Sequence, residues 1–490
     1  MNSGHRLAAS RLEVLLVAAA AIVVLVAFAA NVGFVVSTTR DRLLDGVEGE
    51  VLFEASRLRD GLALYVDPIR GAFDYGAVPS RYYVLYLPVW AWLLSLVPAH
   101  DAPLASRIAA AGLWFGLLGI LVATSHKGRR LPALFAALFL GGTYTLTLFA
   151  AAGRPDALAV ALAGLAALRT SRRARIDAVA GALFALAVCV KPNVVGLGAG
   201  MFAVDLWERR ARAWPGLCGA LSVVGAVVGA LGLATHGACL RHLVLGTAQP
   251  LDLRLWGEQV LGRAQMMGSF VALALACGLK ARSSRASRLL VGGLGSSTGW
   301  AVVCAAKIGS ASNYWLEPCV GALLVFAHVP LPRVESRWRI AGAALLLVQV
   351  LWSGVASTRS CLEWRRLTAE RRRALELARA GLVPMAVVIA DEPGLEVALN
   401  GRLITTPFQM THLVASGRFP VRLWLDDVSR SDVQGVVLMD DLLERPISAV
   451  DFAHDRFPPE LRRRLRELYM LQAVHGGFYV YRRRDAPSRP

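Results

Sequence analysis

Charged residues are scarce in this chain of 490 residues: Asp, Glu, Lys and Arg make up only 18% of it, and hydrophobic residues make up 56%. The mean hydropathy is accordingly positive, at +0.50. So small a charged share is not that of an ordinary soluble domain. It indicates a polytopic membrane protein.

The chain also lacks the cysteine and histidine spacings that are typical of metal sites or disulfide frameworks. Its seven cysteines form no C-x-x-C pair and no His/Cys ligand spacing, so neither kind of site is indicated. His236 and His242 have no paired ligand spacing, and we interpret them as polar residues of an exposed loop. Five cysteines lie in or beside apolar runs: Cys189, Cys218, Cys277, Cys304 and Cys319.

Acidic residues are too few to balance the basic ones, which leaves a formal net charge of +18. Lys and Arg occur in short tracts between apolar runs, not along one polar face. We therefore expect a topological cause for the charge and no nucleic-acid partner. The tracts are "HKGRR" (126–130), "SRRAR" (171–175), "ERRAR" (208–212), "KARSSRASR" (280–288) and "RVESRWR" (333–339).

Long apolar runs dominate the first 356 residues. The run from Glu13 to Val36 is long enough to span a bilayer, and it is too long for a signal peptide, without a convincing cleavage site. We expect an uncleaved helix with its N-terminus inside. Ten further runs follow: Leu104–Thr124, Leu131–Ala151, Ala157–Leu168, Ala178–Val190, Val194–Trp207, Gly216–Ala234, Val260–Leu279, Leu289–Ala306, Trp315–Val329 and Ile340–Ala356.

The segment from Tyr82 to Pro98 decides the topology. The basic tracts occupy alternate loops, and they share the inner side with Arg6 and Arg11 only if this segment does not cross. Because it is short, aromatic and broken by Pro88, we expect an interfacial or re-entrant helix. The sequence then predicts about eleven spans, a cytoplasmic N-terminus and an extracytoplasmic C-terminus.

This topology places most polar residues of the apolar region at the outer face, where clustered acids and bases suit a charged amphiphile. Simpler interpretations remain open for several of them. Asp45 and Glu48 could merely flank the first span, Asp156 could be an N-cap after Pro155, and Lys191 could be a snorkelling side chain. The outer residues are Asp45, Glu48, Arg154, Asp156, Lys191, Asn193, Asn313 and Glu317.

The charged residues that follow Glu48 have a simpler explanation. The spacing of Glu50, Glu54, Arg57 and Arg59 fits one amphipathic helix on the membrane surface, where pairing and solvation account for their charges. We predict no catalytic role for them.

Several stretches together resemble the GT-C glycosyltransferases, polytopic enzymes that use lipid-phosphate-linked sugars. "DGVEGEVLFEASRLRDGLALYVDP" and "VPSRYYVLYLP" are similar to the first external loop of the protein mannosyltransferase and aminoarabinose transferase groups. "GRPDALAVALAGLAAL", "KPN" and "GSASNYWLE" resemble later external motifs of this superfamily. The chain departs from it in its separated acids, since many members have adjacent carboxylates.

The resemblance implies an inverting transfer of a sugar from a polyprenyl-phosphate donor to a glycan, lipid or protein acceptor at the outer face of a bacterial plasma membrane. It implies that Asp45 or Glu48 is the general base, that Asp156 orients the acceptor or Arg154, and that Arg154 and Lys191 bind the donor phosphate. No metal is required, although a divalent ion at the acids fits the chemistry. Further substrate contacts are assigned to Arg81, Tyr82, Asn193, Asn313, Tyr314 and Glu317.

The composition changes after Ala356, which predicts a transmembrane domain over 1–356, with its first external loop at 37–103, and a small extracytoplasmic α/β domain over 357–490. "VPMAVVIADEPG", "VQGVVLMDD" and "GFYVYRRR" are typical of strands. "CLEWRRLTAERRRALELARAG" and "PPELRRRLRELYMLQ" are typical of helices. The expected fold is thus mainly α with a small C-terminal α/β domain.

Two other classes of protein fit the same apolar helices. A transporter or lipid flippase would use them without bond chemistry, but such proteins tend to show internal repeats and mid-membrane charges. We find no convincing repeat, and the charges gather at one face. In a structural membrane subunit, the acidic outer loop would be incidental.

Overall fold

The computed structural model describes residues 3–330, 336–382, 387–441, 443 and 456–485. The chain divides into two compact units. The helical unit comprises Met1–Ser37, Arg107–Gly229 and Asp252–Trp364, and the mixed unit comprises Thr38–Ser106, Ala230–Leu251 and Arg365–Pro490. Residues Thr38–Ser106, which make up most of the loop predicted at 37–103, thus group with the C-terminal part of the chain.

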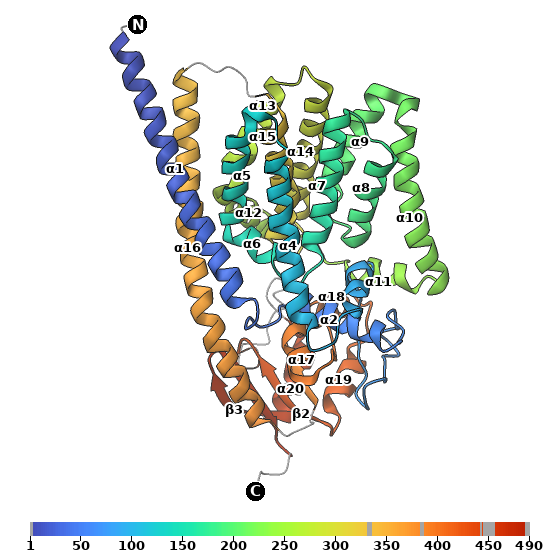
Figure 1. Cartoon of the computed structure of the whole chain (residues 1–490). Coiled ribbons are helices and arrows are strands. Elements are labelled where there is room, and N and C mark those ends of the chain that lie inside the picture. The colour runs from blue at the N-terminus through green and yellow to red at the C-terminus, as the bar shows by residue number, and fades with distance from the viewer. Residues whose placement is uncertain (1–2, 331–335, 383–386, 442, 444–455, 486–490) are drawn as a thin grey trace. The chain divides into compact units, whose positions relative to one another are not determined.

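Helices form at all eleven apolar runs, which confirms the mainly α fold (Figure 1). Among the residues that the structure describes, five helical segments can cross a membrane by length and composition, or up to six if the bent pair α5–α6 is one span, so the count of eleven stays a prediction. The helices are α1 (Ser3–Thr38), α4 (Ala102–Ala123), η1 (Lys127–Arg129), α5 (Arg130–Gly142), α6 (Tyr144–Ala150), α7 (Asp156–Arg173), α8 (Ala178–Val190), α9 (Gly196–Arg209), η2 (Arg210–Ala213), α10 (Trp214–Ala234), α12 (Leu253–Arg263), η3 (Ala264–Gly268), α13 (Ser269–Lys280), α14 (Arg285–Cys304), η4 (Ser312–Trp315), α15 (Leu316–His328) and α16 (Ser336–Gly381).

Small residues let the helices of this unit approach closely. A Cβ on Gly200 of α9 would lie 2.1 Å from the backbone oxygen of Gly292 in α14, and one on Gly196 would lie 2.5 Å from Ser297 Cα. Such contacts are typical of helix packing in lipid, where dispersion and not the hydrophobic effect holds helices together. The pair α9–α14 is therefore specified by its glycines.

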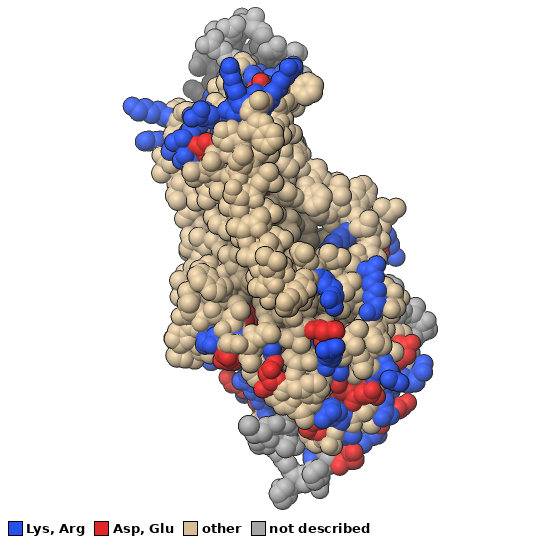
Figure 2. Space-filling view, turned by 90° about the vertical axis from the view of Figure 1, so that its right-hand side faces the viewer, with Lys and Arg blue, Asp and Glu red and all other residues tan. Residues whose placement is uncertain are grey.

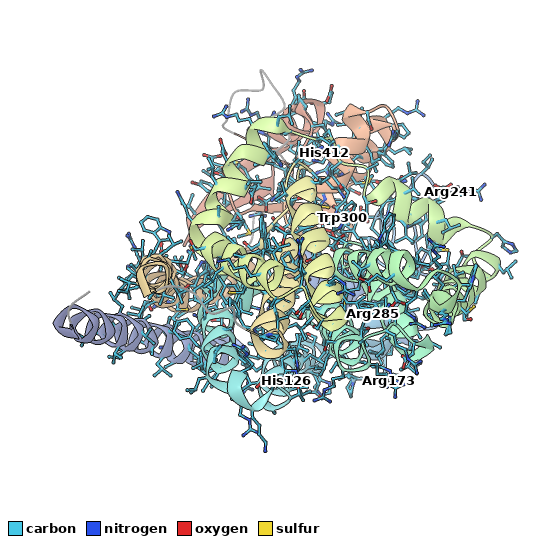
Figure 3. The ribbon with its side chains drawn as sticks, turned by 90° about the horizontal axis from the view of Figure 1, so that it is seen from above. His126, Arg173, Arg241, Arg285, Trp300 and His412 are labelled. Carbon is cyan, nitrogen blue, oxygen red and sulfur yellow. The ribbon has the colours of Figure 1, made fainter. Side chains whose placement is uncertain are left out.

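Basic residues gather at one end of the helical unit, beside a broad apolar band (Figure 2). Figure 3 is viewed from that end and labels His126, Arg173 and Arg285, which belong to three of the basic tracts. The beginning of the last tract, "RVESRWR", lies outside the described residues. A basic end next to an apolar band is the distribution that the positive-inside rule leads us to expect.

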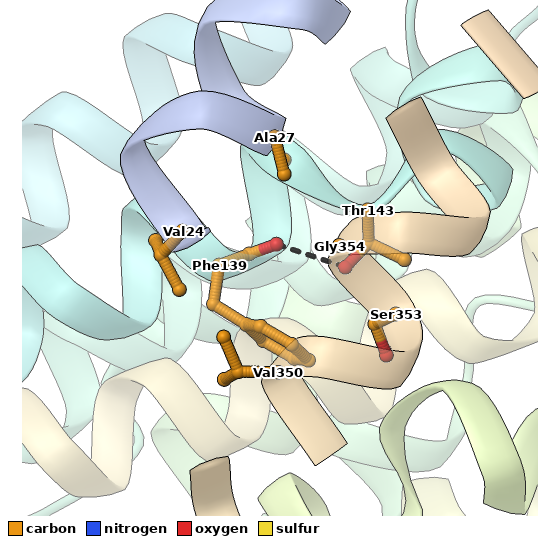
Figure 4. A pocket seen from close by; sticks show the side chains of 8 residues that line it. Val24, Ala27, Phe139, Thr143, Val350, Ser353 and Gly354 are labelled. Carbon is orange, nitrogen blue, oxygen red and sulfur yellow. Dashed lines mark hydrogen bonds between the residues drawn. The ribbon is translucent and has the colours of Figure 1, made fainter. Parts of the chain in front are cut away.

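A small pocket lies in the helical unit between α1, α5 and α16 (Figure 4). Its polar side chains are Thr143, whose Oγ1 donates to Phe139 O at 2.8 Å, and Ser353. No charged side chain lines it, so it does not suit a phosphate. The lining residues are Val24, Ala27, Phe139, Gly142, Thr143, Val350, Ser353 and Gly354.

The mixed unit contains a four-stranded sheet of order β1-β2-β4-β3, in which β1 and β2 are parallel and the other neighbours antiparallel. Its core is built from buried side chains of the strands and helices, including Ile389, Val436, Trp424 and Tyr481. The elements are α2 (Gly46–Arg59), α3 (Val89–Ser95), α11 (Ala238–Gly246), β1 (Val387–Ala390), α17 (Pro393–Asn400), α18 (Pro407–Ala415), α19 (Val421–Ser429), β2 (Val433–Leu438), α20 (Pro459–Leu468), β3 (Tyr469–His475) and β4 (Phe478–Arg483).

Two predictions for this unit need correction. The helix expected over "PPELRRRLRELYMLQ" ends at Leu468, because Tyr469 and the residues after it pair with β4 as strand β3. The segment between the apolar runs Gly216–Ala234 and Val260–Leu279, in which His242 was interpreted as a residue of an exposed loop, contains α11 and the start of α12, and His242 is buried in α11. The residues "VPMA" before β1 lie outside the described residues.

Candidate active site

Three of the residues predicted for the donor phosphate and its neighbours meet in the helical unit. Asp156 is the first residue of α7, and Lys191 follows the last residue of α8. The Asp156 carboxylate lies 2.5 Å from Lys191 Nζ through Oδ1 and 3.3 Å from Arg154 Nε through Oδ2. Asp156 and Lys191 are almost completely buried, at 1% and 2% exposure. We refer to Arg154, Asp156 and Lys191 as the ionic triad.

Two other predicted residues lie near the ionic triad. Asn313 in η4 is close to the Asp156 carboxylate, and its own Oδ1 is buried without a hydrogen-bond partner among the described residues. Tyr314 lies near the charges of Asp156 and Arg154. The side-chain oxygen of Asn193, two residues after Lys191, is also buried without a hydrogen-bond partner in the described part of the chain, while its backbone oxygen accepts from Trp300 Nε1 at 3.0 Å.

Glu317, in contrast, forms hydrogen bonds that stabilise the start of a helix. Its carboxylate accepts hydrogen bonds from the backbone N–H groups of Gly196 at 3.1 Å and Leu197 at 2.7 Å, at the start of α9. A carboxylate there satisfies N–H groups that have no partner within the helix, and it complements the helix dipole. The structure therefore gives Glu317 a capping role, with a side chain only 3% exposed.

Asp45 and Glu48 form a capping box at the start of α2 in the mixed unit. Asp45 Oδ1 accepts from the Glu48 N–H at 2.8 Å, and Glu48 Oε2 accepts from the Asp45 N–H at 3.1 Å. Arg42 contributes an ion pair to Glu48 Oε1 at 3.3 Å. Glu48 is buried, whereas Asp45 is half-buried. The capping box accounts for the D-x-x-E spacing of the two carboxylates.

The acids after Glu48 are not on a solvated surface, so that prediction was wrong. Glu50 and Glu54 are each only 4% exposed. Gln409 Nε2 of α18 donates to Glu50 Oε1 at 3.1 Å. Burial and the neighbouring Glu50 charge raise the pKa of Glu54 well above its ordinary value. The helix carries polar groups into the unit because it is covered on several sides by distant parts of the chain.

The two arginines of the same helix form hydrogen bonds and an ion pair with nearby residues. Arg57 donates to Ala63 O and pairs with Asp74 Oδ2 at 2.7 Å, and Arg59 donates to backbone oxygens of Val97 and Leu94. These bonds anchor α2 to the loop that follows it. They also explain why the helix needs two arginines near its C-terminal end.

Arg81 and Tyr82, predicted as substrate contacts, are buried within the mixed unit. Arg81 pairs with Asp427 of α19 and donates to the backbone oxygens of Pro68 and Ile69. The Tyr82 hydroxyl donates to Leu64 O at 2.7 Å. Both side chains thus hold the first external loop against its surroundings.

Sequence reasoning missed His242, Gln409 and the burial of Glu50. His242 is 2% exposed; its Nδ1 accepts from Val84 N–H and its Nε2 lies 2.9 Å from Val66 O, and burial lowers its pKa to about 4. Glu50 and Gln409 are 359 residues apart in sequence. No local pattern signals such contacts. Within the described part of the chain, no group of three or more His, Cys, Asp or Glu residues is arranged to hold a metal ion.

No protein-family model and no curated protein matches the chain. Its fold is similar to two crystal structures of ArnT from Cupriavidus metallidurans. The apo structure shares 13% identity and a TM-score of 0.55, over 97% of this chain and 98% of ArnT. The structure bound to undecaprenyl phosphate shares 14% identity and a TM-score of 0.52, over 96% and 97% of the two chains. The chain therefore has the fold of the ArnT structures.

Proposed function

We propose that the protein is a membrane glycosyltransferase that moves a sugar from a polyprenyl-phosphate donor to an acceptor at the outer face of the plasma membrane. One observation carries the proposal: the likeness to ArnT extends over nearly the whole of both chains, and one of those structures holds undecaprenyl phosphate. The acceptor can be a glycan, a lipid or a protein.

The ionic triad supports a site for the donor phosphate. Two cations and one carboxylate are buried together there. Arginine and lysine side chains bind phosphate through charge-assisted hydrogen bonds. Arg154 and Lys191 would stabilise the charge that grows on a lipid phosphate as the sugar leaves.

The acceptor hydroxyl needs a base, and we assign this role to Asp45. Glu48 is buried and its carboxylate is engaged by Arg42, whereas Asp45 is half-buried. Attack on C1 of the sugar from the side opposite the phosphate would break the C1–O bond, transfer the proton to the carboxylate and invert the anomeric configuration. No metal ion takes part in this scheme.

The test uses the purified full chain in lipid nanodiscs with undecaprenyl-phosphate-linked sugars and envelope extracts as acceptor source. Asp45→Asn keeps a good N-cap but removes the base, so transfer should fall about a hundredfold while donor binding is retained. Lys191→Met should weaken donor use about tenfold or more, because a charge-assisted phosphate contact of about 1.5 to 3 kcal/mol is lost.

The matched control is Asp252→Asn, the same substitution at the N-cap of α12, where Asp252 accepts from the N–H groups of Arg254 and Leu255. It should leave transfer unchanged. Near-normal transfer in Asp45→Asn would refute the assignment of the base. Movement of lipid-linked sugar across the membrane of sealed proteoliposomes, without any transfer, would instead identify a flippase.

A further inference from the structure

An acceptor atom of Gln409 is buried next to a buried carboxylate. Gln409 is 6% exposed and belongs to α18; its Nε2 donates to Glu50 Oε1 of α2 at 3.1 Å. Its Oε1 is buried and has no hydrogen-bond partner among the residues that the structure describes. Buried polar atoms are rarely left unsatisfied, because each costs free energy unless a water or ligand bonds to it. An O–H donor placed here would satisfy Gln409.

The surroundings connect this pair to the carboxyl end of β1. Arg456 pairs with Glu392, the second residue after β1, at 3.3 Å, and its guanidinium lies 5.0 Å from the centre of the Phe408 ring. Phe408 precedes Gln409 in α18. Ligands of α/β units commonly bind outside the carboxyl ends of parallel strands, which is where β1 and β2 end.

Close backbone packing fixes α2 at this place. A Cβ on Gly49 would lie 2.5 Å from Gly394 Cα, and one on Gly46 would lie 2.8 Å from Glu392 Oε2. The start of α2 therefore rests directly on the start of α17. Glu50, the next residue after Gly49, is brought to Gln409 by this contact and not by a flexible loop.

We propose that Glu50 and Gln409 form a hydroxyl-binding subsite for a sugar ring, to which the first external loop and the C-terminal part of the chain each contribute one side chain. A carboxylate accepts two or more hydrogen bonds, and an amide both donates and accepts, so the pair matches neighbouring hydroxyls. The subsite deepens the proposed glycosyltransferase function and rests on it. It would discriminate sugars by their hydroxyl pattern, since sites built around a hydroxyl reject ligands that lack it.

Binding measurements on the full chain in nanodiscs test the subsite. The probes are undecaprenyl phosphate, the same lipid phosphate linked to glucose, mannose or arabinose, and the soluble methyl glycosides of these sugars. Tighter binding of a lipid-linked sugar than of undecaprenyl phosphate measures the contact with a donor sugar. Binding of a methyl glycoside measures the contact with an acceptor sugar.

Gln409→Met and Glu50→Gln should each reduce the sugar-dependent gain in affinity about tenfold and leave undecaprenyl phosphate binding unchanged. The control is Asn400→Leu, which removes an amide that bonds to the backbone of Val388 in β1 and should leave the gain intact. If both subsite variants kept the full sugar-dependent gain in affinity, the proposed subsite would be refuted, but the proposed function would not. An unaltered protein that binds neither undecaprenyl phosphate nor any lipid-linked sugar would refute the proposed function with it.

Discussion

At the scale of single residues, the partners of a buried ionisable group indicate whether it stabilises the fold or is a candidate for ligand binding. Glu317, Arg81 and Glu48 have their polar atoms occupied by capping or ion pairs within their own unit. Asp156 pairs with two buried cations, Arg154 and Lys191. Two cations gathered at helix ends are a better indication of an anionic ligand than a single carboxylate that caps a helix.

Ionisation of Glu54 should lower the free energy of unfolding as the pH rises. Burial, with a smaller contribution from Glu50, raises its pKa in the folded state above the ordinary value of 4.5. Between these two pKa values the folded state keeps the proton and the unfolded state has lost it, so folding takes up a proton there. The stabilisation is complete below about pH 4.5 and decreases by about 1.4 kcal/mol per pH unit above it, until the folded pKa is reached.

Glu54→Gln removes this titration, so the variant should lose less stability than the unaltered protein between pH 5 and 8. Thermal unfolding in detergent, followed across this range, measures the difference. Glu258→Gln is the control, because the Glu258 side chain is 64% exposed. Parallel pH profiles for Glu54→Gln and the unaltered protein would show that Glu54 is ionised in both states.

At the scale of elements, hydropathy and local signals predicted much of the structure. The apolar runs, β1, β2 and β4 could be found from composition and periodicity, since each is specified by its own residues. The short α3 also agrees with the interpretation of Tyr82–Pro98: seven helical residues reach only about 10 Å, far less than a bilayer core.

Elements that depend on distant partners were not predictable in this way. β3 begins within a helical pattern and becomes a strand because β4 is available to pair with it. The acids of α2 have surface-helix spacing, yet Gln409 and α17 cover them. The ionic triad is an intermediate case. The sequence placed its members at helix ends on one side, and only the fold determined their contacts.

The contact between α2 and α17 depends on the absence of a side chain at Gly49. Gly49→Ala would place a Cβ within 2.8 Å of three backbone atoms of Pro393 and Gly394, and backbone cannot move aside cheaply. We expect a loss of stability of about 1 to 3 kcal/mol, even though alanine favours helix. Thermal unfolding should show this loss. It should be absent in Gly257→Ala of α12, where the added Cβ meets nothing within 4 Å.

At the scale of the whole molecule, the distribution of basic residues predicts the orientation in the membrane. Lys and Arg gather at one end of the helical unit, whereas the carboxylates of α2 belong to a segment predicted outside (Figure 2). The cytosolic side retains positive loops during insertion. If α3 does not cross, the mixed unit, including the residues after Arg365, is extracytoplasmic.

Labelling of single cysteines in intact cells tests this orientation. In a background without the seven native cysteines, Arg172→Cys and Arg282→Cys should react only after the membrane is permeabilised. Asp60→Cys and Ser416→Cys, which are exposed in the mixed unit, should react with an impermeant maleimide from outside. Reaction of Ser416→Cys only from the cytosol, with Asp60→Cys labelled from outside, would mean that an odd number of crossings separates them. The α2 carboxylates and the C-terminal strands would then face opposite compartments, and neither the Glu50–Gln409 contact nor an outer site that uses both would be compatible with that topology.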